Sequence, residues 1–211
     1  MKIGIIGPGN MGGSLGRLWA AAGHDVMLSY SRSEEKLKAL AAELGPRGSW
    51  GTAAEAAEFA DVVVLAVPWW AVQQAISSAG AGLSGKVLVD VTNPLKTDYS
   101  GLEIGTDDSG GEVVARLSGA RVVKAYNAIF PRLLKSDPRM FGDHMPALFY
   151  CGDDADAKGV VAPLIQQTGF RPVDAGPLLS ARYLEPLVML NIELGRTRKL
   201  PHEWAVTLVE R

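Results

Sequence analysis

Short apolar runs alternate with helical hydrophobic patterns along the first 125 residues of the chain. Four of these runs have the length of a β-strand: 2–6, 25–30, 62–67 and 87–91. The last two are continuous and rich in β-branched residues, which is typical of parallel strands covered by helices on both faces. The alternation therefore predicts repeated βαβ units, and with them a Rossmann-type α/β fold with a doubly wound parallel sheet.

Helix start signals stand between the runs. Ser33 is expected to cap one helix, and Thr52 with Glu55 has the spacing of a capping box. Ser109 with Glu112 repeats that spacing after a long polar, glycine-containing stretch, as expected of a functional loop followed by a helix.

A strand at 121–125 is expected to close an NADP-binding domain over residues 1–125, leaving a small α/β extension over 126–211. The extension contains an apolar strand at 147–151, a helix capped by Asp153 or Asp154, and a terminal helical region around 187–194. Two prolines, Pro163 and Pro186, interrupt these helical patterns, so kinks or later helix starts are expected there. The extension is expected to carry the second-ligand side and the dimer contacts.

Composition narrows the classes of partner. The chain has 211 residues and a net charge of -2, without the basic surface that non-specific nucleic-acid binding needs. Its single cysteine, Cys151, cannot form an internal disulfide, which favours a reducing, cytoplasmic location. No apolar run is long enough to span a bilayer. We therefore expect a small-molecule partner, with neither nucleic acid nor membrane.

The first strand is followed directly by a glycine-rich segment that opens an amphipathic helix. It matches G-x-G-x-x-G and consists of Gly7, Pro8, Gly9, Asn10, Met11 and Gly12. In this context the glycines allow a tight turn and bring the backbone close to a pyrophosphate, which the helix N-terminus binds. A plain β-turn-α corner is the alternative, but the position between strand and helix favours a dinucleotide site.

The end of the second strand selects the dinucleotide. NAD-binding chains place a carboxylate there for the ribose hydroxyls, whereas this chain has Ser31 and Arg32. A hydroxyl and a guanidinium can bind a 2′-phosphate, so the cofactor is predicted to be NADP(H). Lys36 lies one turn further on, and either adds positive charge to the site or is a solvated surface residue.

Ligands of a doubly wound sheet bind beyond the carboxyl ends of the strands, which directs attention to the residues after each strand. We expect further cofactor contacts from Val67, Pro68, Trp69, Asn93 and Asn127. Contacts to a second cofactor or substrate are expected from Trp70, Pro94, Tyr126 and Phe130. The tryptophans have core or interface packing as their alternative role.

The chain offers no catalytic constellation of the hydrolase or metalloprotease type, because it has no Ser-His-Asp order and no H-E-x-x-H. Lys96 and Lys124 are the amines expected near the cleft, and Lys124 has an edge or snorkelling position as its alternative. Hydride transfer between two cofactors needs little acid-base chemistry, since the protein only aligns them. No catalytic side chain and no metal ligand are therefore predicted.

Across its whole length the chain resembles the NADPH:coenzyme F420 oxidoreductase family. Besides the glycine loop, Ser31-Arg32 and Val67-Pro68-Trp69, the resemblance lies in three later segments: 151–154, 173–177 and 180–182. It implies NADP contacts from the loop, from Ser31 and Arg32 and from the turn after Val67, with a second aromatic cofactor against the nicotinamide.

One departure concerns that second cofactor. Deazaflavin-using members of the family tend to carry histidine where this chain has Tyr126 and Asn127. Here the chain is more similar to the cytoplasmic domain of transmembrane metalloreductases, which reduces a flavin. The resemblance thus implies NADP(H) with coenzyme F420, or with a flavin, as the acceptor.

The predicted function is hydride transfer between NADP(H) and a deazaflavin or flavin-like acceptor. The alternatives are an NADPH-dependent flavin or metal reductase that does not use F420, and a non-catalytic NADP-binding sensor. The apolar stretch 184–194, together with the family resemblance, also predicts a homodimer.

Overall fold

The computed structural model describes residues 1–136, 141–142, 144–197, 199 and 204–209. Within them the strands form one 8-stranded sheet of order β3-β2-β1-β4-β5-β6-β7-β8. The strands are β1 (Lys2–Ile6), β2 (Asp25–Ser29), β3 (Gly48–Gly51), β4 (Val62–Leu65), β5 (Val87–Asp90), β6 (Arg121–Lys124), β7 (Ala147–Gly152) and β8 (Arg171–Asp174). Neighbouring strands from β3 to β6 are parallel, β7 is antiparallel to β6, and β8 is parallel to β7. The first six follow the Rossmann order, which confirms the predicted fold class.

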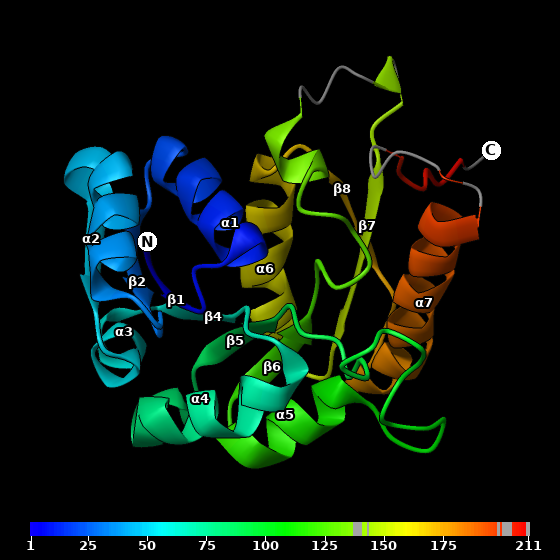
Figure 1. Ribbon diagram of the computed structural model, residues 1–211, viewed down its shortest axis with the longest axis horizontal. Helices are drawn as coiled ribbons and strands as arrows, with labels where there is room; N and C mark the ends of the chain where they lie inside the picture. Colours follow the sequence, from blue (N-terminus) through cyan, green and yellow to red (C-terminus); the bar gives the residue numbers. More distant parts are fainter. Residues whose placement is uncertain (137–140, 143, 198, 200–203, 210–211) are drawn as a thin grey trace.

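Helices cover both faces of the sheet (Figure 1). They are α1 (Asn10–Ala21), α2 (Glu34–Glu43), α3 (Ala53–Phe59), α4 (Val72–Ala79), α5 (Gly110–Ser118), α6 (Ala155–Gln167) and α7 (Ala181–Thr197). One buried cluster joins the sheet to α1, α2 and α6, and a second joins its other face to α3, α4, α5 and the start of α7. The central strands β1, β4, β5 and β6 contribute side chains to both clusters, which explains why the apolar runs of the sequence at β4 and β5 are continuous.

The start signals act as expected at most helices. The Ser33 hydroxyl accepts a hydrogen bond from the Lys36 amide, and Thr52 with Glu55 forms a complete capping box. Asp154, rather than Asp153, caps α6. Three elements were not anticipated: α4 and the two edge strands, β3 and β8.

The prediction that the C-terminal helices start later, at their prolines, is wrong. α6 runs through Pro163 and α7 runs through Pro186. Each proline removes one amide donor from its helix and leaves the carbonyl four residues earlier without that partner. Both prolines lie on exposed positions of their helices, where water can reach that carbonyl.

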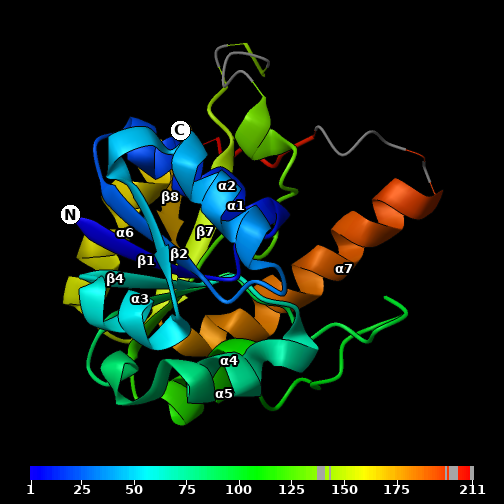
Figure 2. The same cartoon turned by 60° about the vertical axis from the view of Figure 1, so that its left-hand side comes forward.

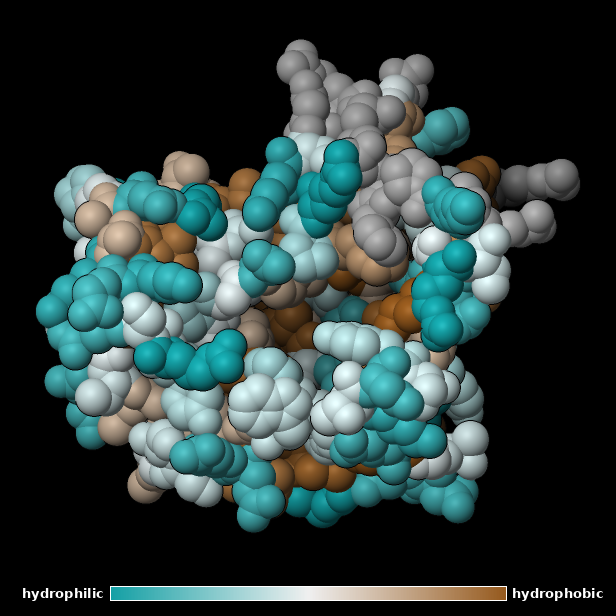
Figure 3. Space-filling model, viewed as in Figure 1, coloured by the Kyte–Doolittle hydropathy of each residue, from teal (hydrophilic) through white to brown (hydrophobic). Residues whose placement is uncertain are grey.

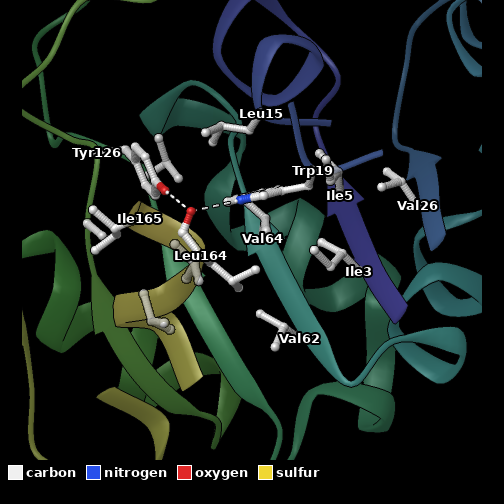
Figure 4. Close-up of a cluster of buried hydrophobic side chains, with 14 of the residues drawn as sticks. Ile3, Ile5, Leu15, Trp19, Val26, Val62, Val64, Tyr126, Leu164 and Ile165 are labelled. Carbon is white, nitrogen blue, oxygen red and sulfur yellow. Dashed lines mark hydrogen bonds between the residues drawn. The ribbon is translucent and has the colours of Figure 1, made fainter. Parts of the chain in front are cut away.

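A buried aromatic contact joins α6 to the first half of the chain (Figure 4). The carbonyl oxygen of Leu164, near the end of α6, accepts hydrogen bonds from Trp19 Nε1 at 3.1 Å and from the Tyr126 hydroxyl at 3.3 Å. The two rings pack edge to face with centroids 6.0 Å apart. Segments on both sides of residue 125 therefore share a hydrophobic core, and a domain boundary at that residue stays a prediction.

Helix α7 projects from the body of the molecule (Figure 2). Its inward residues Leu184, Glu185, Val188 and Asn191 are buried, whereas Tyr183 and Leu190 are 71% and 54% exposed. Across the described ranges, no helix combines the length and apolar character needed to cross a membrane.

Candidate functional site

The turn after β1 brings backbone amides to the edge of the sheet. Gly7 has a φ of +100°, and a Cβ there would lie 2.6 Å from the Ala66 carbonyl oxygen, so only glycine fits. Gly9 precedes α1 and provides no side-chain cap for its first amides. A Cβ added to Gly9 would meet no atom within 4 Å. The first turn of α1 therefore offers amide donors and open space to an anion.

A first cavity of about 580 Å³ lies beside this turn and reaches the end of β2. Its lining consists of Gly7, Pro8, Gly9, Tyr30, Ser31, Arg32, Ala66, Val67, Pro68, Trp70, Ala71 and Gln74. Arg32 is a cation of this lining, and none of the lining residues carries a carboxylate. The composition suits a phosphorylated ligand, because no negative charge in the lining opposes it.

A second cavity of about 450 Å³ adjoins the first. It is lined by Gly9, Asn10, Met11, Ala66, Val67, Pro68, Trp69, Trp70, Val91, Thr92, Asn93, Leu95, Lys96, Thr97, Tyr99 and Pro131. The two linings share Gly9, Ala66, Val67, Pro68 and Trp70. Figure 3 shows this face of the molecule hollowed near its centre, with hydrophobic residues at the bottom of the hollow. Ligands bound in the two cavities would therefore contact the same residues.

Most of the predicted contact residues line at least one cavity. The exceptions are Gly12, Lys36, Asn127, Pro94, Tyr126 and Phe130, which appear in neither lining. Gly12 is buried in α1, where a Cβ would collide with the Gly7 carbonyl, so it shapes the turn instead. Lys36 is exposed on α2, Pro94 is buried near Gly110, and Phe130 packs on Trp204 with ring centroids 6.3 Å apart.

For Tyr126 the expected ligand contact is not what the structure shows. Its side chain is 1% exposed and lies in the core against Trp19. Burial raises the pKa of its hydroxyl well above the ordinary value, so this group remains a neutral donor. The residue has a left-handed φ of +62°, which turns the chain sharply as it leaves β6. Tyr126 thus shapes the loop that follows.

Asn93 and Asn127 bind each other across the ends of β5 and β6. The side-chain amide of Asn93 donates to the backbone carbonyl of Asn127 at 2.8 Å. The side-chain amide of Asn127 donates to Asn93 Oδ1 at 3.0 Å and to the Leu184 carbonyl at 2.9 Å. Asn127 is buried, whereas Asn93 lines the second cavity. Asn127 therefore holds Asn93 in place.

Several lining residues were missed by the sequence analysis. Tyr30 has a φ of +61° at the end of β2 and lines the first cavity with Gln74 of α4. Leu95, Thr97 and Tyr99 reach the second cavity from the loop after β5. The length of that loop was the available signal, but its residue order carries no periodicity that would show which side chains point inward.

Lys124 is neither an edge nor a snorkelling side chain, because it is fully buried. Its ammonium lies 2.9 Å from Asp90 Oδ2 and 2.7 Å from Glu185 Oε1. Burial alone would lower the pKa of Lys124, but the two carboxylates more than offset this effect and raise it above the ordinary value. The ammonium therefore stays charged.

The late segments that carry the family resemblance have a structural role. Asp153 accepts a hydrogen bond from the Leu178 amide at 2.8 Å, which fastens the 3₁₀ turn Leu178–Ser180 to the end of β7. Cys151 is buried, and burial raises the pKa of its thiol to about 12, which makes a reactive thiolate unavailable near neutral pH. These residues lie outside both cavity linings.

Comparison with known proteins identifies the family of this chain. The model of a family described as NADP oxidoreductase, coenzyme F420-dependent, matches residues 2–94. The F420-dependent NADP reductase of Methanothermobacter marburgensis is 32% identical over 92% of this chain and 92% of its own length. The chain belongs to the F420-dependent NADP reductase family. It is accordingly an NADP-dependent oxidoreductase by family.

Further relatives and solved structures show how far this family likeness extends. The metalloreductase STEAP3 of Rattus norvegicus is 32% identical over 88% of this chain, which spans only 36% of that protein. A crystal structure of an Arthrobacter sp. FB24 protein, provisionally named as an F420-dependent NADP-reductase, superposes with a TM-score of 0.83 at 31% identity and covers 94% of this chain and 95% of that one. An imine reductase from Myxococcus stipitatus in complex with NADP+ superposes with a TM-score of 0.70 at 20% identity, over 94% of this chain and 63% of that one. This likeness shows that the two proteins share the fold.

Proposed function

We propose that this chain transfers a hydride between NADP(H) in the first cavity and a flat flavin-like acceptor, first of all coenzyme F420, in the second. The observation that carries the proposal is the common wall of the two cavities, made by Gly9, Ala66, Val67, Pro68 and Trp70. Direct hydride transfer requires the two reacting rings in contact, with water excluded between them. The family assignment independently supports this pair of ligands.

The residues of the first cavity fit the dinucleotide. Gly9 leaves room for the pyrophosphate next to the first amides of α1. Ser31 and Arg32 would bind the 2′-phosphate at the far end of the same lining. When bound, the nicotinamide ring supplies or accepts the hydride. The side chains of the second cavity, including Met11, Trp69 and Asn93, would orient the acceptor and exclude water.

A second candidate is an NADPH-dependent flavin or metal reductase that does not use F420. It is favoured by the 32% identity with the metalloreductase and by Tyr126 and Asn127 after β6. A non-catalytic NADP sensor is the third possibility.

One experiment separates the three. The protein is mixed with NADPH and, in separate cuvettes, with F420, FMN, FAD or a ferric chelate, while the nicotinamide absorbance is followed. Rapid oxidation with F420 is the expected result. Oxidation with FMN, FAD or ferric chelate alone would replace F420 by that acceptor, and tight NADPH binding without any oxidation would support the sensor.

Cofactor selection is tested by Arg32→Ala. We expect NADPH binding to weaken by about 1–3 kcal/mol, because a charge-assisted contact to the 2′-phosphate is lost, while NADH binding changes little. Calorimetric titration of both dinucleotides measures this difference. Lys36→Ala is the matched control, since Lys36 is exposed and outside the lining. Equal losses for NADPH and NADH in Arg32→Ala would contradict the assignment.

We also propose that two copies of the chain associate through the outward face of α7. Its exposed apolar residues Tyr183, Pro186 and Leu190 follow helical spacing. In a two-fold antiparallel crossing centred near Pro186, Tyr183 of one copy would face Leu190 of the other, so the stripe is complementary to itself.

The substitution Leu190→Lys tests this dimer. Because Leu190 is 54% exposed, the monomer should lose little stability, while sedimentation should change from dimer to monomer at micromolar concentration. Leu117→Lys is the control, since Leu117 is a 46% exposed leucine on α5. A wild-type protein that sediments as a monomer would refute the proposal.

A further inference from the structure

Three charged side chains are buried together beneath the second cavity. Lys124 and Asp90 are 0% exposed and Glu185 is 2% exposed. They come from β6, β5 and α7, so the ion pairs of Lys124 join three elements distant in the sequence. Burying such groups costs free energy unless each is fully paired, and the cluster is not needed for the hydride transfer proposed above. The contacts of the cluster indicate that it positions the loop between β5 and α5.

The members of the cluster hold the start of the loop between β5 and α5. Lys124 Nζ donates to the Thr92 carbonyl at 2.6 Å. Asp90 Oδ1 accepts from the Thr92 amide at 2.9 Å and from the Thr92 hydroxyl at 2.7 Å. Thr92 therefore has three hydrogen bonds to two buried charges, and it lines the second cavity.

Glu185 holds the other end of the same loop. Its two carboxylate oxygens accept hydrogen bonds from the amides of Gly110, at 2.9 Å, and Gly111, at 3.0 Å. These are the first two residues of α5, where the positive end of the helix dipole adds to the attraction. Because Glu185 is also paired with Lys124, a continuous chain of polar contacts joins the two ends of the loop.

The packing around Glu185 leaves little freedom. A Cβ added to Gly110 would lie 3.0 Å from Glu185 Oε1 and 3.2 Å from the Trp69 ring. Trp69 itself lines the second cavity, so Gly110 at the loop end lies next to both the carboxylate and the cavity wall. A shift of Glu185 would therefore reach that wall through Gly110.

Contacts within the loop fold it on itself. They include the Lys96 amide to the Gly101 carbonyl at 2.9 Å, the Glu103 amide to the Pro94 carbonyl at 2.7 Å, and an isolated bridge between Leu95 and Leu102. Besides the charged cluster, Asn127 holds the loop at Asn93, and the ion pair of Asp108 with Arg116 holds it near α5. Leu95, Lys96, Thr97 and Tyr99 form one side of the second cavity.

We propose that Glu185 and Lys124 are positioning residues that clamp both ends of loop 93–109 and thereby hold its side chains against the acceptor in the second cavity. Through this clamp, the position of α7 would affect the affinity for the acceptor without any contact between the clamp and the dinucleotide. The acceptor part of this inference rests on the proposed function, whereas the loop part does not.

The test is Glu185→Gln, which keeps the size of the side chain and removes its charge. The variant should fold, because Lys124 remains paired with Asp90. Neutral hydrogen bonds are roughly half as strong as charge-assisted ones, so amide hydrogen exchange in 93–111 should rise about tenfold. The acceptor KM should rise by about the same factor, with kcat changed less than threefold, because only the binding geometry is loosened. NADPH affinity should stay within about twofold.

Arg196→Gln is the control, because it breaks an ion pair on α7 that involves no residue of the loop. Arg196 Nη1 lies 3.2 Å from Glu193 Oε1. Its hydrogen exchange in 93–109 and its acceptor KM should match the wild type. If Glu185→Gln behaves like this control, or loses only global stability, the clamp is refuted.

Two further outcomes remain decisive. If no acceptor is reduced, the proposed function fails, and hydrogen exchange alone then tests the clamp. If Glu185→Gln does not fold, Glu185→Asp keeps the charge on a shorter side chain, and faster exchange confined to 93–111 is expected. Unchanged exchange in Glu185→Asp would overturn the inference.

Discussion

Replacing Gly9 with alanine is expected to weaken NADPH binding by about 2 kcal/mol, roughly thirtyfold in Kd, with a loss of stability of about 1 kcal/mol or less. The added methyl would meet no protein atom within 4 Å and would occupy open space at a residue that lines both cavities. At this turn the backbone must approach the pyrophosphate closely. Fluorescence titration with NADPH measures Kd. Denaturant unfolding measures stability, for which only the difference between glycine and alanine at the N-cap of α1 is expected.

Gly12→Ala is the control, because its main expected effect is on stability and not on NADPH binding. Its methyl would collide with the Gly7 carbonyl oxygen inside the turn, and Ile5 lies 3.0 Å away. Overpacking of this kind destabilises by about 1–3 kcal/mol, so here the free energy of unfolding should fall. If Gly9→Ala binds NADPH as the wild type does, the first cavity is not the dinucleotide site.

Replacing Lys124 with methionine is expected to lower the free energy of unfolding by about 3–5 kcal/mol. The substitution leaves Asp90 and Glu185 buried without the cation that lies within 2.9 Å of both. An uncompensated buried charge is far more costly than a lost surface pair, because neither water nor salt can screen it. Urea unfolding at neutral pH gives the value.

Two companion variants show whether charge is the cause. Lys158→Met breaks a pair with Asp174 whose side chains are 18% and 45% exposed, and should cost about 1 kcal/mol or less. Adding Asp90→Asn to Lys124→Met removes one of the two orphaned charges and should recover at least about 1 kcal/mol. A Lys124→Met loss no larger than that of Lys158→Met would contradict this account.

The two strands that could not be predicted from the sequence, β3 and β8, were missed for a common physical reason. β3 reads GSWG and β8 reads RPVD, and both are edges of the described sheet. Edge strands tolerate glycine and proline because one side needs no ladder partner, so they lack the apolar run that marks a central strand. Pairing with β2 and β7, rather than local propensity, makes them strands.

The residues of the candidate site also fall into two groups: those that a local sequence pattern marks, and those that only the tertiary structure positions. Gly7, Gly9, Ser31 and Arg32 could be predicted to form one site, and all four line the first cavity, because their spacing from the end of a strand follows the dinucleotide-binding pattern. Tyr126 could not be assigned, because its φ of +62° turns its ring into the core and no sequence pattern encodes that angle. Asn127 and Phe130, in the same loop, likewise contact protein groups that only the fold brings near.

The sequence by itself determined the alternation of strands and helices, the glycine turn after β1 and the absence of a carboxylate directly after β2. These features are local, since each depends on residues within one strand-turn-helix unit. Only the tertiary structure decided that two cavities share a wall, and that Lys124, Asp90 and Glu185 meet beneath the second one. Residues 90, 124 and 185 are far apart in the chain, so their charges come together only when β5, β6 and α7 pack.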